Sequence, residues 1–252
     1  MVTFTSPLDI AIFVIEIVAC ISFATSGAIT ALRKKADILG VIILTLIEVL
    51  GGGLLRDLIL QKGAPHIFWD PEYYILAAVT TVIAVFWFIL AYFKKSAKFV
   101  EKHRHDFWIY LLDAIGIGVF CIAGVKTSLA VMDPSYQMIS KVIFLSSLGV
   151  ITGVCGGVFR DVFVGEIPMV FKKKFYMTPC ILGTIIYVLY TLLSPDRSLE
   201  ILFILLSLVV IVGLRVLAVI FQWNLPVAKG YNQMVEEESK FQPKREENSN
   251  KE

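Results

Sequence analysis

Gly51–Leu60 reads "GGGLLRDLIL", and Gly156–Gly165 reads "GGVFRDVFVG". Each stretch places consecutive glycines and then an Arg-Asp pair inside a long apolar segment. Glycine adopts backbone conformations that other residues rarely reach, and a charge within a membrane is costly unless it has a partner. The two stretches therefore predict a polar feature that occurs twice in an otherwise apolar chain.

The composition is that of a membrane protein. Of 252 residues, 57% are hydrophobic and 17% are charged. A helix needs about 20 apolar residues to cross a bilayer, and seven runs are predicted to do so: 8–31, 38–61, 73–93, 107–130, 139–163, 175–194 and 199–222. The connections are too short to hold a soluble domain. We therefore expect an all-α polytopic protein of the cell membrane, with the lipid bilayer as its surroundings.

Two regions differ in composition. Residues 1–223 form the predicted transmembrane domain. Residues 224–252 include "VEEESKFQPKREENSNKE", whose few apolar residues and mixed charges predict a disordered tail.

Lysine and arginine indicate the orientation. The connections after the first, third and fifth runs carry eleven of these cations, and those after the second, fourth and sixth carry three. The positive-inside rule therefore predicts that the N-terminus lies outside and the tail in the cytoplasm. A cleaved signal peptide is the alternative for residues 1–30, but "MVTFTSPLD" lacks a basic region and carries Asp9.

Other chemical signals are weak. The four cysteines lie in apolar helices without metal-ligand spacing, so they are interpreted as packing thiols: Cys20, Cys121, Cys155 and Cys180. His103 and His105 flank Arg104 in a basic loop, for which solvation is the simpler interpretation. The chain contains neither GxSxG nor HExxH. We therefore expect no enzyme activity, metal, cofactor or nucleic-acid partner.

The sequence contains an internal repeat. "IEIVACISFATSG" in the first run corresponds to "LDAIGIGVFCIAG" in the fourth, and the Gly-Gly-x-x-Arg-Asp motifs of the second and fifth runs correspond as well. The aligned pairs are Glu16/Asp113, Phe23/Phe120, Gly27/Gly124, Gly52/Gly156, Gly53/Gly157, Arg56/Arg160, Asp57/Asp161, Pro65/Pro168, Phe68/Phe171 and Tyr73/Tyr176. The predicted units are residues 8–93 and 107–194, followed by a seventh helix at 199–222.

Three crossings per unit make the second unit enter from the opposite face, which predicts an inverted repeat. Inverted-repeat transporters place their sites near the midplane, where corresponding helices are interrupted. The second and fifth helices are therefore predicted to break around a polar path, at these glycines: Gly51, Gly52, Gly53, Gly156 and Gly157. Cys155 replaces the first glycine of the second motif, so the second break is expected to be shallower.

Close helix packing is the alternative explanation of the glycines. Gly149, Gly153 and Gly157 follow the GxxxGxxxG spacing that lets helices approach in lipid. We favour packing for Gly149 and Gly153. For the Gly-Gly pairs we favour a break, because packing does not explain the charges one turn later.

The charges are predicted to pair by depth. Counted along the helices, Glu16 and Arg56 fall in the outer half, and Asp113 and Arg160 in the inner half. Each arginine could therefore bind the acid of its own repeat. The alternative is that the arginines extend to the headgroups with Asp57 and Asp161 as interfacial partners. Lys126 aligns with an apolar residue and either lines the path or marks the outer interface.

The repeated Gly-Gly-x-x-Arg-Asp motif, the "LDAIGIGVFCIAG" helix and the three-plus-three-plus-one plan resemble the prokaryotic branch of the trimeric intracellular cation (TRIC) channel family. Bacterial members are also described as glycine-transporter-domain (UPF0126-type) proteins. The resemblance implies a homotrimer with one pore per subunit for monovalent cations such as potassium. By position, helix two would contribute Gly51, Gly52, Gly53 and Arg56 to the pore, and helix five would contribute Gly156, Gly157 and Arg160.

Two functions remain open. A cation channel must neutralise its two arginines with Glu16 and Asp113, or use a moving arginine as a gate. A carrier for glycine or another small zwitterion could bind a carboxylate at half-helix N-termini and an amine at an acid.

Overall fold

The computed structural model describes residues 7–61, 63–93, 107–172, 175–194, 197–221 and 223. The elements are α1 (Pro7–Arg33), α2 (Ile38–Leu60), η1 (His66–Phe68), α3 (Pro71–Phe93), α5 (Phe107–Val131), α6 (Met138–Phe163), α7 (Met169–Lys172), α8 (Thr178–Leu193), η2 (Arg197–Leu199) and α9 (Glu200–Ile220). His103, His105 and the tail at 224–252 lie outside the described residues, so the predictions made for them stay predictions.

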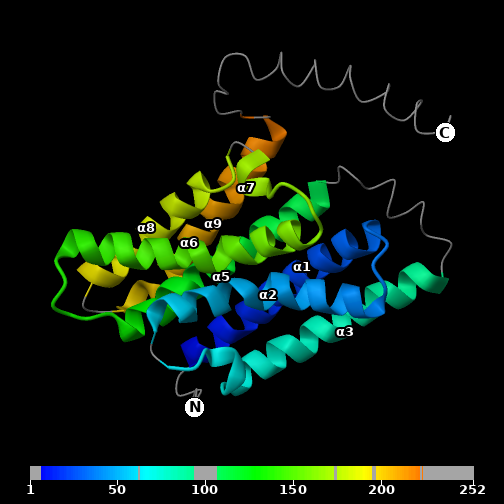
Figure 1. The fold of residues 1–252 in the computed structure, drawn as a ribbon. Coiled ribbons are helices and arrows are strands. Elements are labelled where there is room, and N and C mark those ends of the chain that lie inside the picture. Colours follow the sequence, from blue (N-terminus) through cyan, green and yellow to red (C-terminus); the bar gives the residue numbers. More distant parts are fainter. Residues whose placement is uncertain are drawn as a thin grey trace, which may run out of the picture.

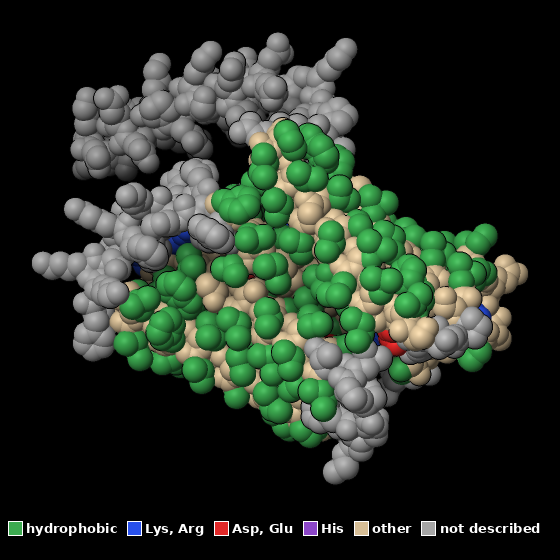
Figure 2. Space-filling view, turned by 180° about the vertical axis from the view of Figure 1, so that it is seen from behind, with side chains coloured by type: hydrophobic (Ala, Val, Ile, Leu, Met, Phe, Trp, Pro, Cys, Tyr) green, Lys and Arg blue, Asp and Glu red, His purple; other side chains and the backbone are tan. Residues whose placement is uncertain are grey.

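The seven predicted helices are present, and six of them are long and apolar enough to cross a membrane. The exception is α8, which has 16 residues where the sequence predicted a run over 175–194. Its helix begins only at Thr178, with Pro179 in the first turn, where a proline needs no backbone hydrogen bond. Apolar side chains make up most of the coloured side-chain surface in Figure 2, as expected for a surface in contact with lipid.

The helices form two groups that meet along α2 and α6. Within the first group α1, α2 and α3 contact one another, and within the second α5 packs on α6 and α8. α9 covers α5 and α8, while α1 lies against α5 and α2 against α6 (Figure 1). The buried core fills the space between the groups and includes Phe23 and Ile117.

The predicted helix breaks are absent, and that prediction was wrong. α2 continues as an α-helix through Gly51, Gly52 and Gly53, and α6 through Gly156 and Gly157. Glycines at these positions were predicted to free backbone groups. In the structure they keep their helical conformation, and Gly52 and Gly156 serve packing.

The glycines let α2 and α6 cross with their backbones in contact. A Cβ on Gly52 would overlap the carbonyl oxygen of Thr152, and a Cβ on Gly156 would overlap the carbonyl oxygen of Glu48. Under the repeat alignment Glu48 corresponds to Thr152, so the two contacts are equivalent. Small residues permit such close approach in membranes, and here they join one three-helix group to the other.

Candidate permeation site

A polar cavity of about 400 Å³ lies among α1, α2, α3 and α5. Charged and titratable side chains of both signs line it together with apolar ones: Glu16, Arg56, His66, Asp70, Glu72 and Lys126. Gly53 and Thr152 also contribute to the wall, so the cavity reaches the α2–α6 crossing. It is large enough for several water molecules, each of which takes about 30 Å³ in the liquid.

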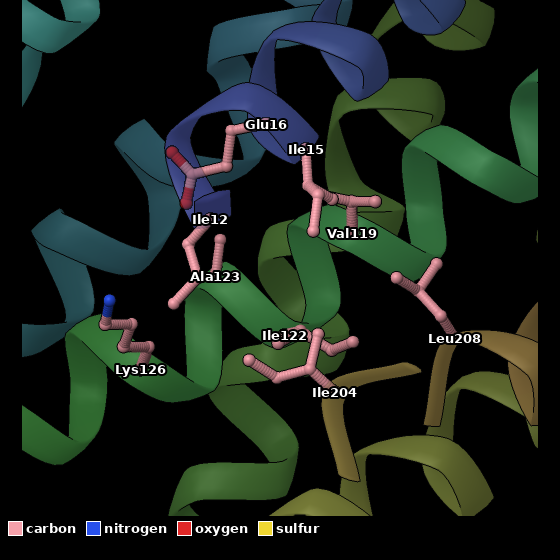
Figure 3. Close-up of a pocket in the computed structure, with 9 residues that line it drawn as sticks. All are labelled: Ile12, Ile15, Glu16, Val119, Ile122, Ala123, Lys126, Ile204 and Leu208. Carbon is pink, nitrogen blue, oxygen red and sulfur yellow. The ribbon is translucent and has the colours of Figure 1, made fainter. Parts of the chain in front are cut away.

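Glu16 and Lys126 enter this region from two different helices. Figure 3 shows a smaller pocket beside the cavity, where Glu16 of α1 and Lys126 of α5 lie toward the same side. Ile204 and Leu208 of α9 line the opposite, apolar side. Lys126 therefore borders the cavity, and Glu16 provides a carboxyl group in the same space.

Arg56 is held by two neighbours on the wall of the cavity. Its Nε and Nη2 donate to Asp57 Oδ1 at 2.8 and 2.6 Å, and its Nη2 also donates to Tyr73 Oη at 2.8 Å. Asp57 Oδ2 accepts from the backbone N–H of His66 at 2.9 Å. With 2% of its surface exposed, Arg56 points into the protein. Its acidic partner is Asp57, the residue that the interfacial alternative named.

Arg160 repeats this arrangement in the second unit. Its Nε and Nη2 donate to Asp161 Oδ1 at 2.9 and 2.8 Å. Asp161 Oδ2 accepts from the backbone N–H of Met169 at 2.9 Å. Each arginine thus fixes the aspartate that follows it, and each aspartate caps the short segment after its helix. These contacts match because the repeat alignment pairs Arg56 with Arg160 and Asp57 with Asp161.

The two arginines differ in what lies beyond these shared contacts. Arg56 faces the cavity, whereas Arg160 is fully buried. Arg160 Nη1 donates to Glu48 Oε1 at 2.5 Å and to Ser26 Oγ at 2.9 Å, both in the first unit. The two ends of the α2–α6 crossing are therefore unequal: one is open to a cavity, and the other is closed by an ion pair.

In the part of the chain that the structure describes, the predicted pairing of each arginine with the acid of its own repeat is seen for Arg160 alone. Arg160 Nη1 lies 3.9 Å from Asp113 Oδ1, although Glu48 is closer. Arg56 has Asp57 and Tyr73 as its hydrogen-bond partners. Glu16 lines the same cavity as Arg56, and their pairing stays a prediction.

Two charged residues of this region were not recognised from the sequence. Glu48 pairs with Arg160, and Arg215 of α9 donates to Asp113 Oδ2 at 2.5 Å. Arg215 also lies over the ring of Tyr176, 3.9 Å from its centroid. Both Glu48 and Arg215 are isolated charges within apolar runs, which by itself indicates a functional or paired position. The isolated charge could have marked both positions in the sequence, but it does not identify the residue with which each one pairs.

Solved structures with the same architecture are cation channels. The chain matches a structure described under the structural basis for conductance through TRIC cation channels, with a TM-score of 0.70 and 29% identity, covering 86% of this chain and 96% of the other. A TRIC orthologue from Rhodobacter sphaeroides has the same fold, with a TM-score of 0.68 at 24% identity and coverage of 84% and 99%. The protein is thus a polytopic membrane protein with the TRIC channel fold.

Sequence comparison gives the family. The model of the glycine transporter family matches residues 13–89 and 110–191. The UPF0126 inner membrane protein YadS of Escherichia coli K12 is 30% identical over 85% of this chain and 95% of its own length. The UPF0126 membrane protein YvgT of Bacillus subtilis is 34% identical over 84% and 94%. The chain belongs to this glycine transporter (UPF0126) family and is a multi-pass protein of the cell membrane.

Proposed function

We propose that the protein is a channel for monovalent cations such as potassium, with one path through each subunit of a homotrimer. The observation that carries the proposal is the polar cavity of about 400 Å³ that reaches the α2–α6 crossing. The TRIC fold supports it, because solved structures with this fold are described as cation channels.

The charges of the cavity suit a cation. Glu16, Asp70 and Glu72 supply three carboxylates against the two fixed cations Arg56 and Lys126. Acidic side chains on a path attract cations, and carboxylates also neutralise nearby arginines. Arg56 is further neutralised by Asp57 at 2.6 Å. Acidic side chains therefore outnumber the lysine and arginine on the wall that an entering cation meets.

The path is proposed to continue from the cavity past the glycines of the two motifs. Gly53 and Gly157 occupy equivalent places beside the Tyr73 and Tyr176 hydroxyls, where a Cβ would lie 3.5 and 3.4 Å away. The remaining glycines of the proposed pore segment, Gly51, Gly52 and Gly156, set the spacing of the two helices there. In the closed end Arg160 blocks the path, so conduction requires Arg160 to move away from Glu48.

The proposed topology is an inverted repeat with the N-terminus outside. The cavity is lined by Ile12 and Phe13 in the N-terminal part of α1. By the distribution of basic residues this end of α1 faces outward. The cavity then opens to the outside, and the Arg160 end faces the cytoplasm.

A second function is supported by the presence of both charge signs in one cavity. A small zwitterion such as glycine could place its carboxylate near Arg56 or Lys126 and its ammonium near Glu16. Such binding would make the protein a carrier.

Flux measurements on purified protein in liposomes distinguish the two. Unitary current steps carried by potassium support the channel. Saturable glycine uptake that carries no current and is unaffected by potassium supports the carrier. Light scattering of the purified protein tests the trimer separately, because either function could reside in another assembly.

A further inference from the structure

Five charged side chains form a closed cluster at the buried end of the α2–α6 crossing. They come from four helices of both groups, and each is at most 6% exposed: Glu48, Asp113, Arg160, Asp161 and Arg215. Three carboxyl groups face two guanidinium groups. If all five were ionised, the cluster would carry one uncompensated negative charge.

The three acids are not equally well compensated. Asp161 accepts two bonds from Arg160 and one from the backbone N–H of Met169. Asp113 has Arg215 as its own partner. Among charged groups Glu48 has only Nη1 of Arg160, which also donates to Ser26 and lies 3.9 Å from Asp113. Its other hydrogen-bonding neighbour is the neutral Ser26 hydroxyl. Glu48 is therefore the carboxyl group with the least opposing charge.

Two carboxyl oxygens in the cluster lack any hydrogen-bond donor within the described chain. They are Oε2 of Glu48 and Oδ1 of Asp113, and their residues are 1% and 0% exposed. Each of these carboxyl groups has a cation at its other oxygen, Arg160 for Glu48 and Arg215 for Asp113. A buried carboxylate whose charge is not fully compensated is disfavoured, and such a group takes up a proton instead.

Among the residues that the structure describes, no cation besides Arg160 faces Glu48. The groups that face it are Ser26 of α1, Asp113 of α5, and Arg160 and Asp161 of α6. Arg215 pairs with Asp113 and lies over the ring of Tyr176. Two of the charged neighbours are acids, which favour the neutral form of Glu48 further.

We propose that Glu48 binds a proton in this conformation, and that the bound proton keeps the Arg160 end of the path closed. Neutral Glu48 still accepts from Arg160 through its carbonyl oxygen, so the ion-pair geometry persists without excess charge. Release of the proton to water leaves the cluster with a net negative charge. That charge is relieved when the cluster opens and admits water or a monovalent cation.

The position of Glu48 connects its charge to the contact between the two groups. Its backbone carbonyl is the atom that a Cβ on Gly156 would overlap. Any movement of the Glu48 side chain away from Arg160 therefore occurs at the crossing that joins α2 to α6. The control of flux rests on the proposed function, whereas the proton site itself does not.

Infrared spectroscopy of the full-length protein in lipid tests the proton site directly. We compare the wild type with Glu48→Gln, which mimics a protonated glutamate, and with Glu166→Gln as the matched control. Glu166 is a half-exposed glutamate that pairs with Lys34 at 2.9 Å, outside the cluster. The wild type should show a carboxylic-acid C=O band that shifts in D₂O. Glu48→Gln should lose the intensity of one acid, and Glu166→Gln should lose none.

The unfolding temperature of Glu48→Gln provides a second test, which still gives an answer if this variant is unstable. If Glu48 is protonated, Glu48→Gln should unfold at nearly the temperature of the wild type. A variant that fails to fold, or an unchanged carboxylic-acid band in Glu48→Gln, would show that Glu48 is ionised and would overturn the proposal.

Potassium flux across a pH series tests the link to opening. Wild-type flux should rise at least threefold from acidic to alkaline pH, and Glu48→Gln should remain at the acidic level throughout. If the carboxylic-acid band of Glu48 is present but no potassium flux is seen at any pH, the channel is refuted and the proton site stands. Flux that does not respond to pH would refute the proposed closure and leave the channel intact.

Discussion

Replacement of Gly52 by alanine is expected to separate α2 from α6. The added Cβ would overlap the carbonyl oxygen of Thr152 and come within 2.9 Å of its carbonyl carbon. Both atoms belong to the backbone of α6, so no side-chain rotation relieves the overlap. The crossing must widen, and the contact between the two helix groups must weaken.

Two opposing effects set the change in the free energy of unfolding of Gly52→Ala. Forcing extra volume into a packed interior costs about 1–3 kcal/mol. Alanine in place of glycine favours the helix by about 1 kcal/mol. Because the obstacle is backbone, we expect the upper part of the first range. The free energy of unfolding should therefore fall by about 1–2 kcal/mol.

Denaturant unfolding in detergent, followed by circular dichroism, measures this change. Two glycines serve as controls. A Cβ on Gly213 of α9 would meet no atom within 4 Å, and one on Gly53 would lie at ordinary contact distance, 3.5 Å, from Tyr73. Gly213→Ala and Gly53→Ala should leave stability unchanged or raise it. If Gly52→Ala unfolds at the same denaturant concentration as Gly213→Ala, the assignment of Gly52 to a backbone crossing is wrong.

Three further predictions concern the charges and the repeat. Arg160→Ala should lower the free energy of unfolding by about 3–5 kcal/mol, because it leaves buried acids without their cation. Arg56→Ala should cost clearly less, because Arg56 lines the cavity and water can fill its place beside Asp57. Parallel denaturant curves of the two variants measure the difference, and equal losses would contradict it. Asp113→Asn removes the partner of Arg215 and should also cost about 3–5 kcal/mol, and unchanged stability would show that Arg215 is compensated elsewhere. Residues 8–93 should superpose on 107–194 after a rotation of about 180° around an axis in the membrane plane, as expected for inverted repeats, and a parallel superposition would reverse the proposed topology.

The helices and their order could be predicted from hydropathy alone, because each span must satisfy its own backbone hydrogen bonds within one segment. The sequence predicted α2 over 38–61, and the structure has Ile38–Leu60. The same local rule failed for α8, which begins at Thr178, after Tyr176, with Pro179 in its first turn. The Arg-Asp motifs were also recognised from the sequence, because charges stand out in an apolar run.

The role of the glycines could not be decided from sequence. A helix break and a close helix crossing both require a residue without a Cβ, so the same letters fit either. Only the position of the second helix distinguishes them, and α6 places the carbonyl oxygen of Thr152 against Gly52. The break was favoured because charges follow the glycines, but each arginine is neutralised by the aspartate beside it.

The sequence by itself determined that this is a membrane protein of two similar three-helix units and a seventh helix, because hydropathy and repeats are properties of order along the chain. The tertiary structure alone decided which charges meet. Glu48 and Arg160 are 112 positions apart, and Asp113 and Arg215 are 102 apart. An electrostatic partner is set by distance in space, and helix packing alone brings such distant positions to within a hydrogen bond. Both units carry the same Gly-Gly-x-x-Arg-Asp motif, so the motif cannot explain why the two ends of the crossing differ. The difference follows from the helix packing, which places Glu48 against Arg160.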